Sequence, residues 1–209
     1  MNAIFCIYNN GIIGIDGKLP SEVIPGLAQQ PAVKLDMKMF RQVTKGATVV
    51  MGRNTWESLN RKPLPGRKNI IITSAPENLA KENPPYRFKD YVNYLTKDQF
   101  DKWYNKTSEN VWIIGGVNLL KEYIPQCEQV YVNELHCKDE FEAIDEIALK
   151  RRSTFHKHEL IEILRNSGFV NPDKNISYYL GPDNCFYFRD KVTLYTYRFV
   201  KDYRIGFDK

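Results

Sequence analysis

The sequence has few of the residues that build metal centres or disulfide frameworks. Its 209 residues include three histidines and four cysteines, and no two cysteines form a CxxC pair. The cysteines are scattered at Cys6, Cys127, Cys137 and Cys185. This spacing favours neither a zinc site nor a set of disulfides, so we expect no metal, and reduced thiols in a cytoplasmic protein. His156 and His158 are two residues apart, which on a helix would place them on different faces and argues against a shared metal.

Long apolar runs and a strong charge excess are also missing. No stretch approaches the ~18 apolar residues that cross a bilayer, and residues 1–14 lack the basic start of a signal peptide. The net charge of +5 suits small anionic ligands. Nucleic-acid binding needs a clustered basic face, and the densest basic stretch, residues 150–158, is interpreted as a solvated helix face. We therefore expect neither a membrane nor a nucleic-acid partner.

What is present is enough apolar sequence for one domain, residues 1–209, with 43% hydrophobic residues. Short apolar runs predict strands at residues 3–8, 47–51, 69–73, 111–114, 129–135 and 192–200. The early runs are continuous, as in parallel strands covered on both faces, and the last is typical of an edge or antiparallel strand. Amphipathic helices are expected at residues 33–44, 95–106 and 116–124, the second with Thr96 as its N-cap. The alternation indicates an α/β fold with a mostly parallel sheet.

Two stretches read as additions to this pattern. Residues 21–33 contain two prolines and no periodicity, and are predicted to form an inserted loop. Residues 138–190 form a divergent extended region, predicted to contain a charged helix over residues 150–166 and then Gly/Pro turns.

Two strand ends run through glycine into a helix. Gly115–Gly116 follows one strand, and Gly52 follows another, with Thr55 in the first turn of the next helix. Glycine lets the backbone approach a ligand closely, and a helix N-terminus offers free N–H groups to phosphate. Either junction alone is equally explained as a tight turn without a ligand. Together they could hold one pyrophosphate, although the pattern is not GxGxxG.

Two arginines and two hydroxyls surround the next strand. Thr73 and Ser74 end it, on the side where open parallel sheets bind ligands, near Arg53. Arg67 precedes the strand and lies a strand length away, where its guanidinium could bind a carboxylate bidentately.

Asp36 lies early on the predicted helix over residues 33–44, with Phe40 one turn later on the same face. A carboxylate beside Met37 and Phe40 would be partly desolvated and would need a cationic or hydrogen-bonding partner. An amidine-like edge of a substrate would serve. The alternative is an exposed first-turn Asp that the helix dipole favours.

In this order the motifs IIGIDGKLP, D…F, VMGRNTWESL, LPGRKNIIIT and IGG resemble those of the dihydrofolate reductase family. The resemblance covers most of residues 1–137 and residues 192–200. It implies a three-layer α/β sandwich, with a mostly parallel central sheet and an antiparallel C-terminal strand. It also implies hydride transfer from NADPH to C6 of 7,8-dihydrofolate with protonation at N5.

The resemblance assigns roles to residues. Asp36 would be the catalytic acid that holds the 2-amino and N3 edge of the pterin, and Arg67 would bind the α-carboxylate of the folate glutamate. The expected substrate-binding residues are Ile4, Cys6, Met37, Phe40, Leu59, Arg67, Ile114 and Asn133. The expected cofactor-binding residues are Ile13, Leu19, Gly52, Arg53, Asn54, Thr55, Thr73, Ser74, Gly115, Gly116, Val117 and Asn118. The glycine pair would carry a cis peptide, and residues 14–20 would form a mobile loop that closes over the nicotinamide.

The sequence departs from the family pattern near the site. Family members usually carry Trp after the loop proline, where this chain has Ser21. A family Thr that couples to the acid appears as Asn133, and a Tyr after the glycine pair appears as Leu120. Glu22 is a weaker candidate for the acid than Asp36.

Two other functions remain open. A pyrimidinone reductase of riboflavin synthesis would share the fold and NADPH, but its substrate carries a ribityl phosphate and no glutamate. A non-catalytic NADPH-binding or structural protein on the same scaffold is motivated by Ser21 and the two added stretches. A monomer is expected, with a homodimer as the alternative.

Overall fold

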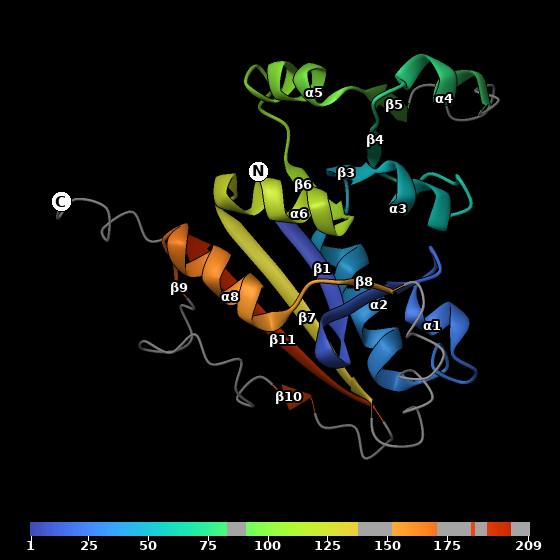
Figure 1. The fold of residues 1–209 in the computed structure, drawn as a ribbon, viewed down its shortest axis with the longest axis vertical. Helices are drawn as coiled ribbons and strands as arrows, with labels where there is room; N and C mark the ends of the chain where they lie inside the picture. The colour runs from blue at the N-terminus through green and yellow to red at the C-terminus, as the bar shows by residue number, and fades with distance from the viewer. Residues whose placement is uncertain (83–90, 138–151, 171–184, 187–191, 202–209) are drawn as a thin grey trace, which may run out of the picture.

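The computed structural model describes residues 1–82, 91–137, 152–170, 185–186 and 192–201. They form one mixed sheet in the order β10-β11-β7-β1-β6-β3-β4-β5 (Figure 1). The six strands from β7 to β5 are parallel, and β11 runs antiparallel to β7. β2 pairs with β1 and β8, and β9 pairs with β11.

The strands are β1 (Asn2–Tyr8), β2 (Ile12–Ile15), β3 (Thr48–Gly52), β4 (Lys68–Ile72), β5 (Val92–Leu95), β6 (Val111–Gly115), β7 (Gln129–Cys137), β8 (Arg152–Thr154), β9 (Phe169–Val170), β10 (Cys185–Phe186) and β11 (Val192–Lys201). The helices are α1 (Pro20–Val23), α2 (Pro31–Val43), α3 (Arg53–Ser58), α4 (Pro76–Glu82), α5 (Lys97–Tyr104), α6 (Val117–Tyr123) and α8 (Lys157–Asn166). Short 3₁₀ turns occupy Asn9–Gly11 and Ile124–Gln126. All six strands predicted from apolar runs are present.

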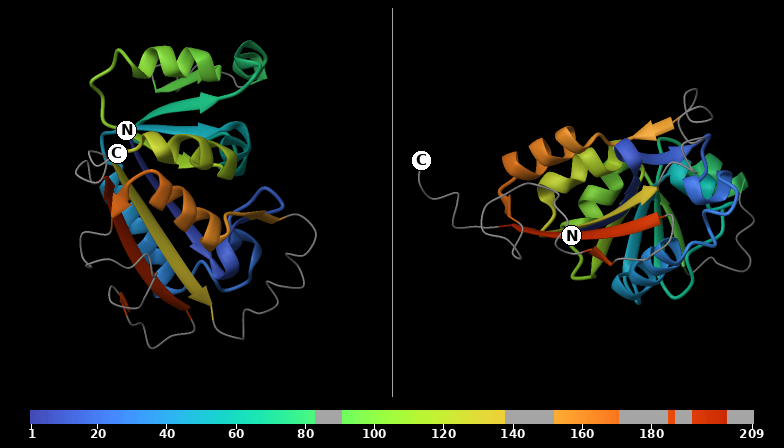
Figure 2. Two further views of the ribbon diagram at one scale, coloured as in Figure 1. Left: turned by 60° about the vertical axis from the view of Figure 1, so that its left-hand side comes forward. Right: turned by 90° about the horizontal axis from the view of Figure 1, so that it is seen from below.

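Helices cover both faces of the sheet. α2 lies on one face against β1, β7 and β11, and α6 and α8 lie on the other (Figure 2). The larger core joins β1, β6 and β7 to α6 and α8 through Phe5, Val132, Tyr123 and Phe155, among others. This is the three-layer sandwich expected from the sequence.

Local signals set several boundaries. The Thr96 hydroxyl accepts from the Gln99 N–H and the Gln99 side chain accepts from the Thr96 N–H, so a capping box starts α5 as predicted. Trp56 is fully buried among Val49, Met51 and Ile71 and is a core residue.

Two predicted boundaries are wrong. Residues 21–33 are not a continuous loop, because α1 covers Pro20–Val23 and α2 already begins at Pro31, where proline suits a first helical turn. The charged helix predicted from residue 150 begins only at Lys157, since Arg152–Thr154 pairs with β2 as strand β8. The rest of the region 138–190, apart from residues 152–170 and 185–186, lies outside the described residues.

His156 precedes α8 as its N-cap instead of lying within it. Its ring therefore stacks on that of His158, with centroids 5.6 Å apart, and the expected separation onto different helix faces is wrong. In the described part of the chain, no group of three or more His, Cys, Asp or Glu side chains is placed to hold a metal. None of the described helices is long and apolar enough to span a bilayer.

Candidate functional site

The two strand–glycine–helix junctions lie side by side. β3 and β6 are parallel neighbours, Gly52 is the N-cap of α3, and Gly116 is the N-cap of α6. A Cβ on Gly52 would lie 3.7 Å from the Gly116 nitrogen, so the two turns are in contact. The Gly115–Gly116 peptide is cis, as expected.

Thr55 packs onto this glycine pair. A Cβ on Gly115 would lie 3.2 Å from Thr55 Oγ1, and Gly115 has a φ of +139° that side-chain-bearing residues rarely adopt. Two features therefore favour glycine over any other residue at Gly115: its backbone conformation and the close approach of Thr55.

A cavity of about 430 Å³ opens at these junctions. Ten expected cofactor residues line it: Ile13, Leu19, Gly52, Arg53, Asn54, Thr55, Gly115, Gly116, Val117 and Asn118. It is also lined by Gly14, Gly17, Lys18, Ser58, Ile72, Ile114, Leu119, Glu122 and Ser153. Gly14, Gly17 and Lys18 lie in the IIGIDGKLP motif and could have been predicted. Ser153 could not, because only the pairing of β8 with β2 brings it there.

The segment of residues 14–20, expected to be a mobile loop, holds a tight turn at one wall of the cavity. Ile15 and Lys18 exchange backbone hydrogen bonds of 2.9 Å each way. Asp16 and Gly17 supply positive φ values of 47° and 73° between them. Its closure over a nicotinamide stays a prediction.

Only some of the residues predicted to bind phosphate lie at the cavity. Arg53 lines the cavity, and its Nε donates to Glu57 Oε1 at 2.8 Å. Thr73 and Ser74 are not among the lining residues. Thr73 is buried, and its Oγ1 accepts from the Ala75 N–H at 3.3 Å within its own turn. A role for Thr73 and Ser74 toward a phosphate remains a prediction.

Asp36 is buried on the sheet side of α2. Only 8% of it is exposed, and Asn133 Nδ2 of β7 donates to its Oδ1 at 2.6 Å. Cys6 of β1 is the register partner of Asn133, so the thiol lies beside the same pair. The alternative of an exposed first-turn Asp36 is therefore wrong.

Burial changes the acidity of this group. Desolvation raises the pKa of Asp36 from 3.8 to about 6, and the hydrogen bonds from Asn133 and Cys6 offset part of the rise. Burial, with Asp36 nearby, likewise raises the pKa of the Cys6 thiol, so Cys6 stays neutral and can donate. The result is a carboxyl group that can hold or release a proton near neutral pH.

Apolar residues join Asp36 to the cavity. Ile4 is buried in a cluster against which Phe40 and Ile114 pack, and Ile114 also lines the cavity. Leu59 packs with Ile114 against the neighbouring cluster of Trp56. Met37 lies next to Asp36 in sequence and is 39% exposed, which leaves its side chain free to meet a ligand.

Arg67 is also buried, at 6% exposure. Its Nη1 donates to Thr44 Oγ1 at 2.9 Å, its Nε donates to the Pro65 carbonyl, and its guanidinium lies 5.6 Å from the Phe40 ring centroid. Burial, and then the charge of Arg41, lower its pKa. In the part of the chain that the structure describes, no carboxylate pairs with Arg67.

Ser21 and Glu22, which precede α2, each have a hydrogen-bonding partner close by. Ser21 hydrogen-bonds the hydroxyl of buried Tyr8, whose pKa is raised mainly by burial. Glu22 is exposed, and its Oε2 accepts from the Leu19 N–H at 2.9 Å at the start of α1. Glu22 is therefore a helix-capping residue, and Asp36 is the buried acid.

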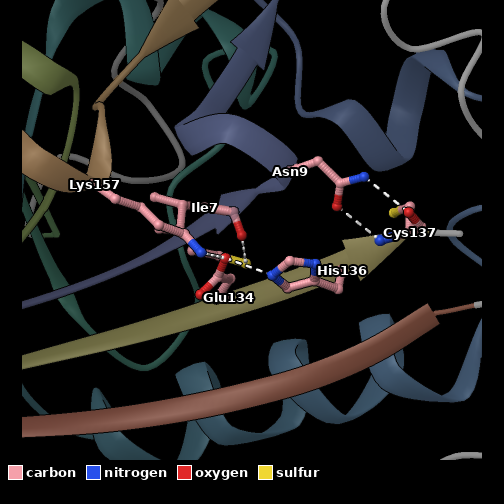
Figure 3. A network of polar contacts seen from close by, with 7 residues as sticks. Ile7, Asn9, Glu134, His136, Cys137 and Lys157 are labelled. Atoms are coloured by element: carbon pink, nitrogen blue, oxygen red, sulfur yellow. Dashed lines mark hydrogen bonds and ion pairs between the residues drawn. The ribbon is translucent and has the colours of Figure 1, made fainter. Parts of the chain in front are cut away.

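A second buried carboxylate lies on the other face of β7 and was missed from sequence. Glu134 is 1% exposed and forms ion pairs with His136, at 2.8 Å, and with Lys157 at the start of α8 (Figure 3). Asn9 bonds both the N–H and the carbonyl of Cys137 at 2.8 Å. Burial would raise the pKa of Glu134, but the hydrogen bonds from His136 and Lys157 outweigh it and lower that pKa. These contacts link β7 to α8 and to the short turn that follows β1.

A model of the family described as dihydrofolate reductase matches residues 1–159. The chain belongs to the dihydrofolate reductase family. It is 34% identical over 133 residues to a dihydrofolate reductase of Bacillus subtilis, covering 64% of this chain and 67% of that one. It is 33% identical over 138 residues to dihydrofolate reductase type A10 of Escherichia coli, covering 64% and 66%.

The family relatives also include a longer protein. A bifunctional dihydrofolate reductase-thymidylate synthase of Paramecium tetraurelia is 30% identical over 128 residues, which is 60% of this chain but 24% of that protein. Among solved structures, a dihydrofolate reductase from Enterococcus faecalis complexed with NADP(H) and RAB-propyl superposes with a TM-score of 0.63 at 22% identity. That superposition covers 97% of this chain and 96% of the other, and it supports the dihydrofolate reductase fold.

Proposed function

We propose that the protein reduces 7,8-dihydrofolate to tetrahydrofolate with NADPH. The observation that carries this proposal is the buried Asp36–Asn133 pair, joined through Ile4, Phe40 and Ile114 to the glycine-lined cavity. A buried acid that can supply a proton, next to a glycine-lined cavity that can hold a hydride donor, suits the reduction of a cyclic C=N bond.

The cavity fits NADPH on its own chemistry. Side chains at Gly115 and Gly116 would fill the approach to Thr55, so the glycines leave backbone N–H groups accessible to a pyrophosphate. Thr55 and Asn54 add polar side chains, and Arg53 adds a cation for the 2′-phosphate side. Bound there, NADPH supplies the hydride. Ile13, Leu19 and Ile114 form the apolar wall that would exclude water from the nicotinamide.

Asp36 orients and protonates the substrate. The pterin 2-amino group and N3–H are donors, and a carboxylate is the acceptor that matches that edge. Asn133 donates to Oδ1 of Asp36, and the two carboxylate oxygens retain further acceptor capacity for the pterin edge. With a pKa of about 6, Asp36 exchanges a proton near neutral pH, which favours protonation at N5.

Arg67 binds the glutamate end of the substrate. Its guanidinium is fixed by Thr44, Pro65 and Phe40 and has no carboxylate partner among the described residues. A substrate carboxylate would supply one. This favours folate over a pyrimidinone with a ribityl phosphate, since an arginine fork matches a carboxylate bidentately.

The test is turnover of NADPH with dihydrofolate, repeated with a pyrimidinone substrate. We expect oxidation of NADPH with dihydrofolate alone. Turnover of only the pyrimidinone would favour the riboflavin-pathway reaction. Tight NADPH binding without turnover of either substrate would identify a non-catalytic protein.

A further inference from the structure

Asp36 is held from two neighbouring strands. Asn133 of β7 donates to its Oδ1 at 2.6 Å. Cys6 of β1 is the register partner of Asn133 in the parallel β1–β7 pair, so both side chains lie on the face of the sheet that α2 covers. The Cys6 thiol hydrogen-bonds the same carboxyl group. The acid on α2 therefore meets one donor from each strand.

The surroundings of Cys6 agree with this orientation. Alternate residues of a strand point to the same face, and Tyr8, two residues after Cys6, is buried with Val33 of α2. Cys6 packs against that cluster and is itself partly buried. Its Sγ also lies 3.8 Å from the Ile7 carbonyl oxygen. That contact is long and its acceptor is neutral, so the single thiol proton favours Asp36 once Asp36 is ionised.

The Cys6 thiol stays un-ionised in this environment. Burial, and then the charge of Asp36 and its hydrogen bond, raise the pKa of the thiol well above its usual value. Cys137 and Glu134 of β7 raise that pKa further. Tyr8 is the remaining titratable neighbour, and burial followed by the charge of Cys6 raises its pKa too. Among the described residues no cation acts on the thiol, so Cys6 keeps its proton and serves Asp36 as a hydrogen-bond donor.

This donor acts on the ionisation of Asp36. Burial raises the pKa of Asp36 to about 6, and the hydrogen bonds from Asn133 and then from Cys6 oppose the rise. No charged side chain in the described part of the chain contributes to that balance. A hydrogen bond to the ionised form favours that form. Loss of the thiol would therefore leave Asp36 protonated up to a higher pH.

We propose that Cys6 is a positioning residue of the reduction: its thiol holds the carboxyl group of Asp36 against β1 and so sets the pH range in which Asp36 delivers a proton. This rests on the proposed function, in which Asp36 protonates dihydrofolate. The thiol only donates a hydrogen bond and keeps its own proton. The proton that reaches N5 is that of Asp36.

The test compares the pH dependence of kcat/KM for dihydrofolate in the wild type, Cys6→Ala and Cys6→Ser. Activity should fall as the pH rises through the apparent pKa of Asp36, because the protonated acid is then lost. Cys6→Ala should move this fall to higher pH by about 0.5–1 pH unit. Cys6→Ser keeps a donor and should return the fall to the wild-type position or below it. The KM for NADPH should stay near wild type in both variants, because Cys6 does not line the cofactor cavity.

Cys127→Ala is the matched control. Cys127 is a buried thiol of the larger core, and its Sγ donates to the Tyr123 carbonyl at 3.3 Å. Its removal should lower stability without moving the pH profile. A midpoint that is the same in the wild type and Cys6→Ala, or that moves equally in Cys6→Ala and Cys127→Ala, would overturn the positioning role while leaving the reductase intact.

A wild type that does not turn over dihydrofolate would instead overturn the proposed function. The contact between Cys6 and Asp36 is then tested in the free protein, by the fall in the free energy of unfolding between pH 4 and pH 7 that ionisation of buried Asp36 produces. A larger fall in Cys6→Ala than in Cys6→Ser would support the contact, and equal falls would overturn it.

Discussion

Asp36→Asn should make the free protein more stable while removing its activity. The carboxyl group is 8% exposed, and desolvation raises its pKa from 3.8 to about 6. Because a tenfold change in proton affinity corresponds to about 1.4 kcal/mol, this rise corresponds to about 3 kcal/mol. An amide of the same shape avoids the cost of ionising a buried acid, and its oxygen can still accept from Asn133.

The pH dependence is the specific signature. A raised pKa in the folded state means that the wild type has its full stability below about pH 3.8 and loses stability as the pH rises through about 6. The free energy of unfolding of Asp36→Asn should therefore exceed that of the wild type by up to about 3 kcal/mol at pH 7, with the gap closing toward pH 4. Denaturant unfolding at several pH values measures the gap. Glu128→Gln, at an exposed carboxylate, gives the baseline.

A gap that does not change between pH 4 and pH 7 would refute this reasoning, because the stabilisation would then not come from proton binding at Asp36. A destabilised Asp36→Asn at pH 7 would show that the ionised carboxylate makes contacts that outweigh its desolvation.

Three further predictions concern the binding site and the opposite face. Arg67→Lys should raise the KM for dihydrofolate by about tenfold or more with a smaller change in kcat, since an ammonium cannot form the bidentate fork; an unchanged KM would remove Arg67 from the substrate site. Gly115→Ala should weaken NADPH binding in a fluorescence titration and lower stability by about 1–3 kcal/mol, because the new Cβ meets Thr55 at 3.2 Å with φ at +139°; wild-type affinity would place the cofactor elsewhere. Glu134→Gln should destabilise the fold by about 1–3 kcal/mol at pH 7, because the buried carboxylate loses its contacts with His136 and Lys157, whose own side chains stay partly exposed to water. This loss should fade as the pH falls below 4.5, because the lowered pKa of Glu134 stabilises the fold only where the group is ionised; a loss that is equal at pH 7 and pH 3 would show a role in packing alone.

Local patterns predicted the parts of the fold that depend on local chemistry. The continuous runs of β3 and β4 predicted buried parallel strands, and Thr96 predicted the start of α5. The two glycine junctions were placed together correctly because parallel strands end at the same edge of a sheet, and β3 and β6 are neighbours.

Long-range pairing accounts for what the sequence did not reveal. Asn133 was expected near the acid through the family resemblance, but its direct bond to Asp36, 97 residues away, depends on the packing of α2 against β7. Strand β8 was predicted as helix because its partner, β2, lies some 140 residues earlier, and no local pattern reports that pairing. The burial of Glu134 was missed because one of its two ion-pair partners, Lys157 of α8, is brought next to it only by the fold; the other, His136, lies on β7 itself.

The most direct measurement is the loss of reduced-nicotinamide absorbance when NADPH and dihydrofolate are mixed with the wild type and with Asp36→Asn, together with the NADPH affinity of each. We expect turnover by the wild type, a loss of about 100-fold or more in the variant, and similar NADPH affinity in both, because Asp36 lies outside the cofactor cavity. Equal turnover by the two proteins, or NADPH binding with no turnover by the wild type, would contradict the assignment of this site to dihydrofolate reduction.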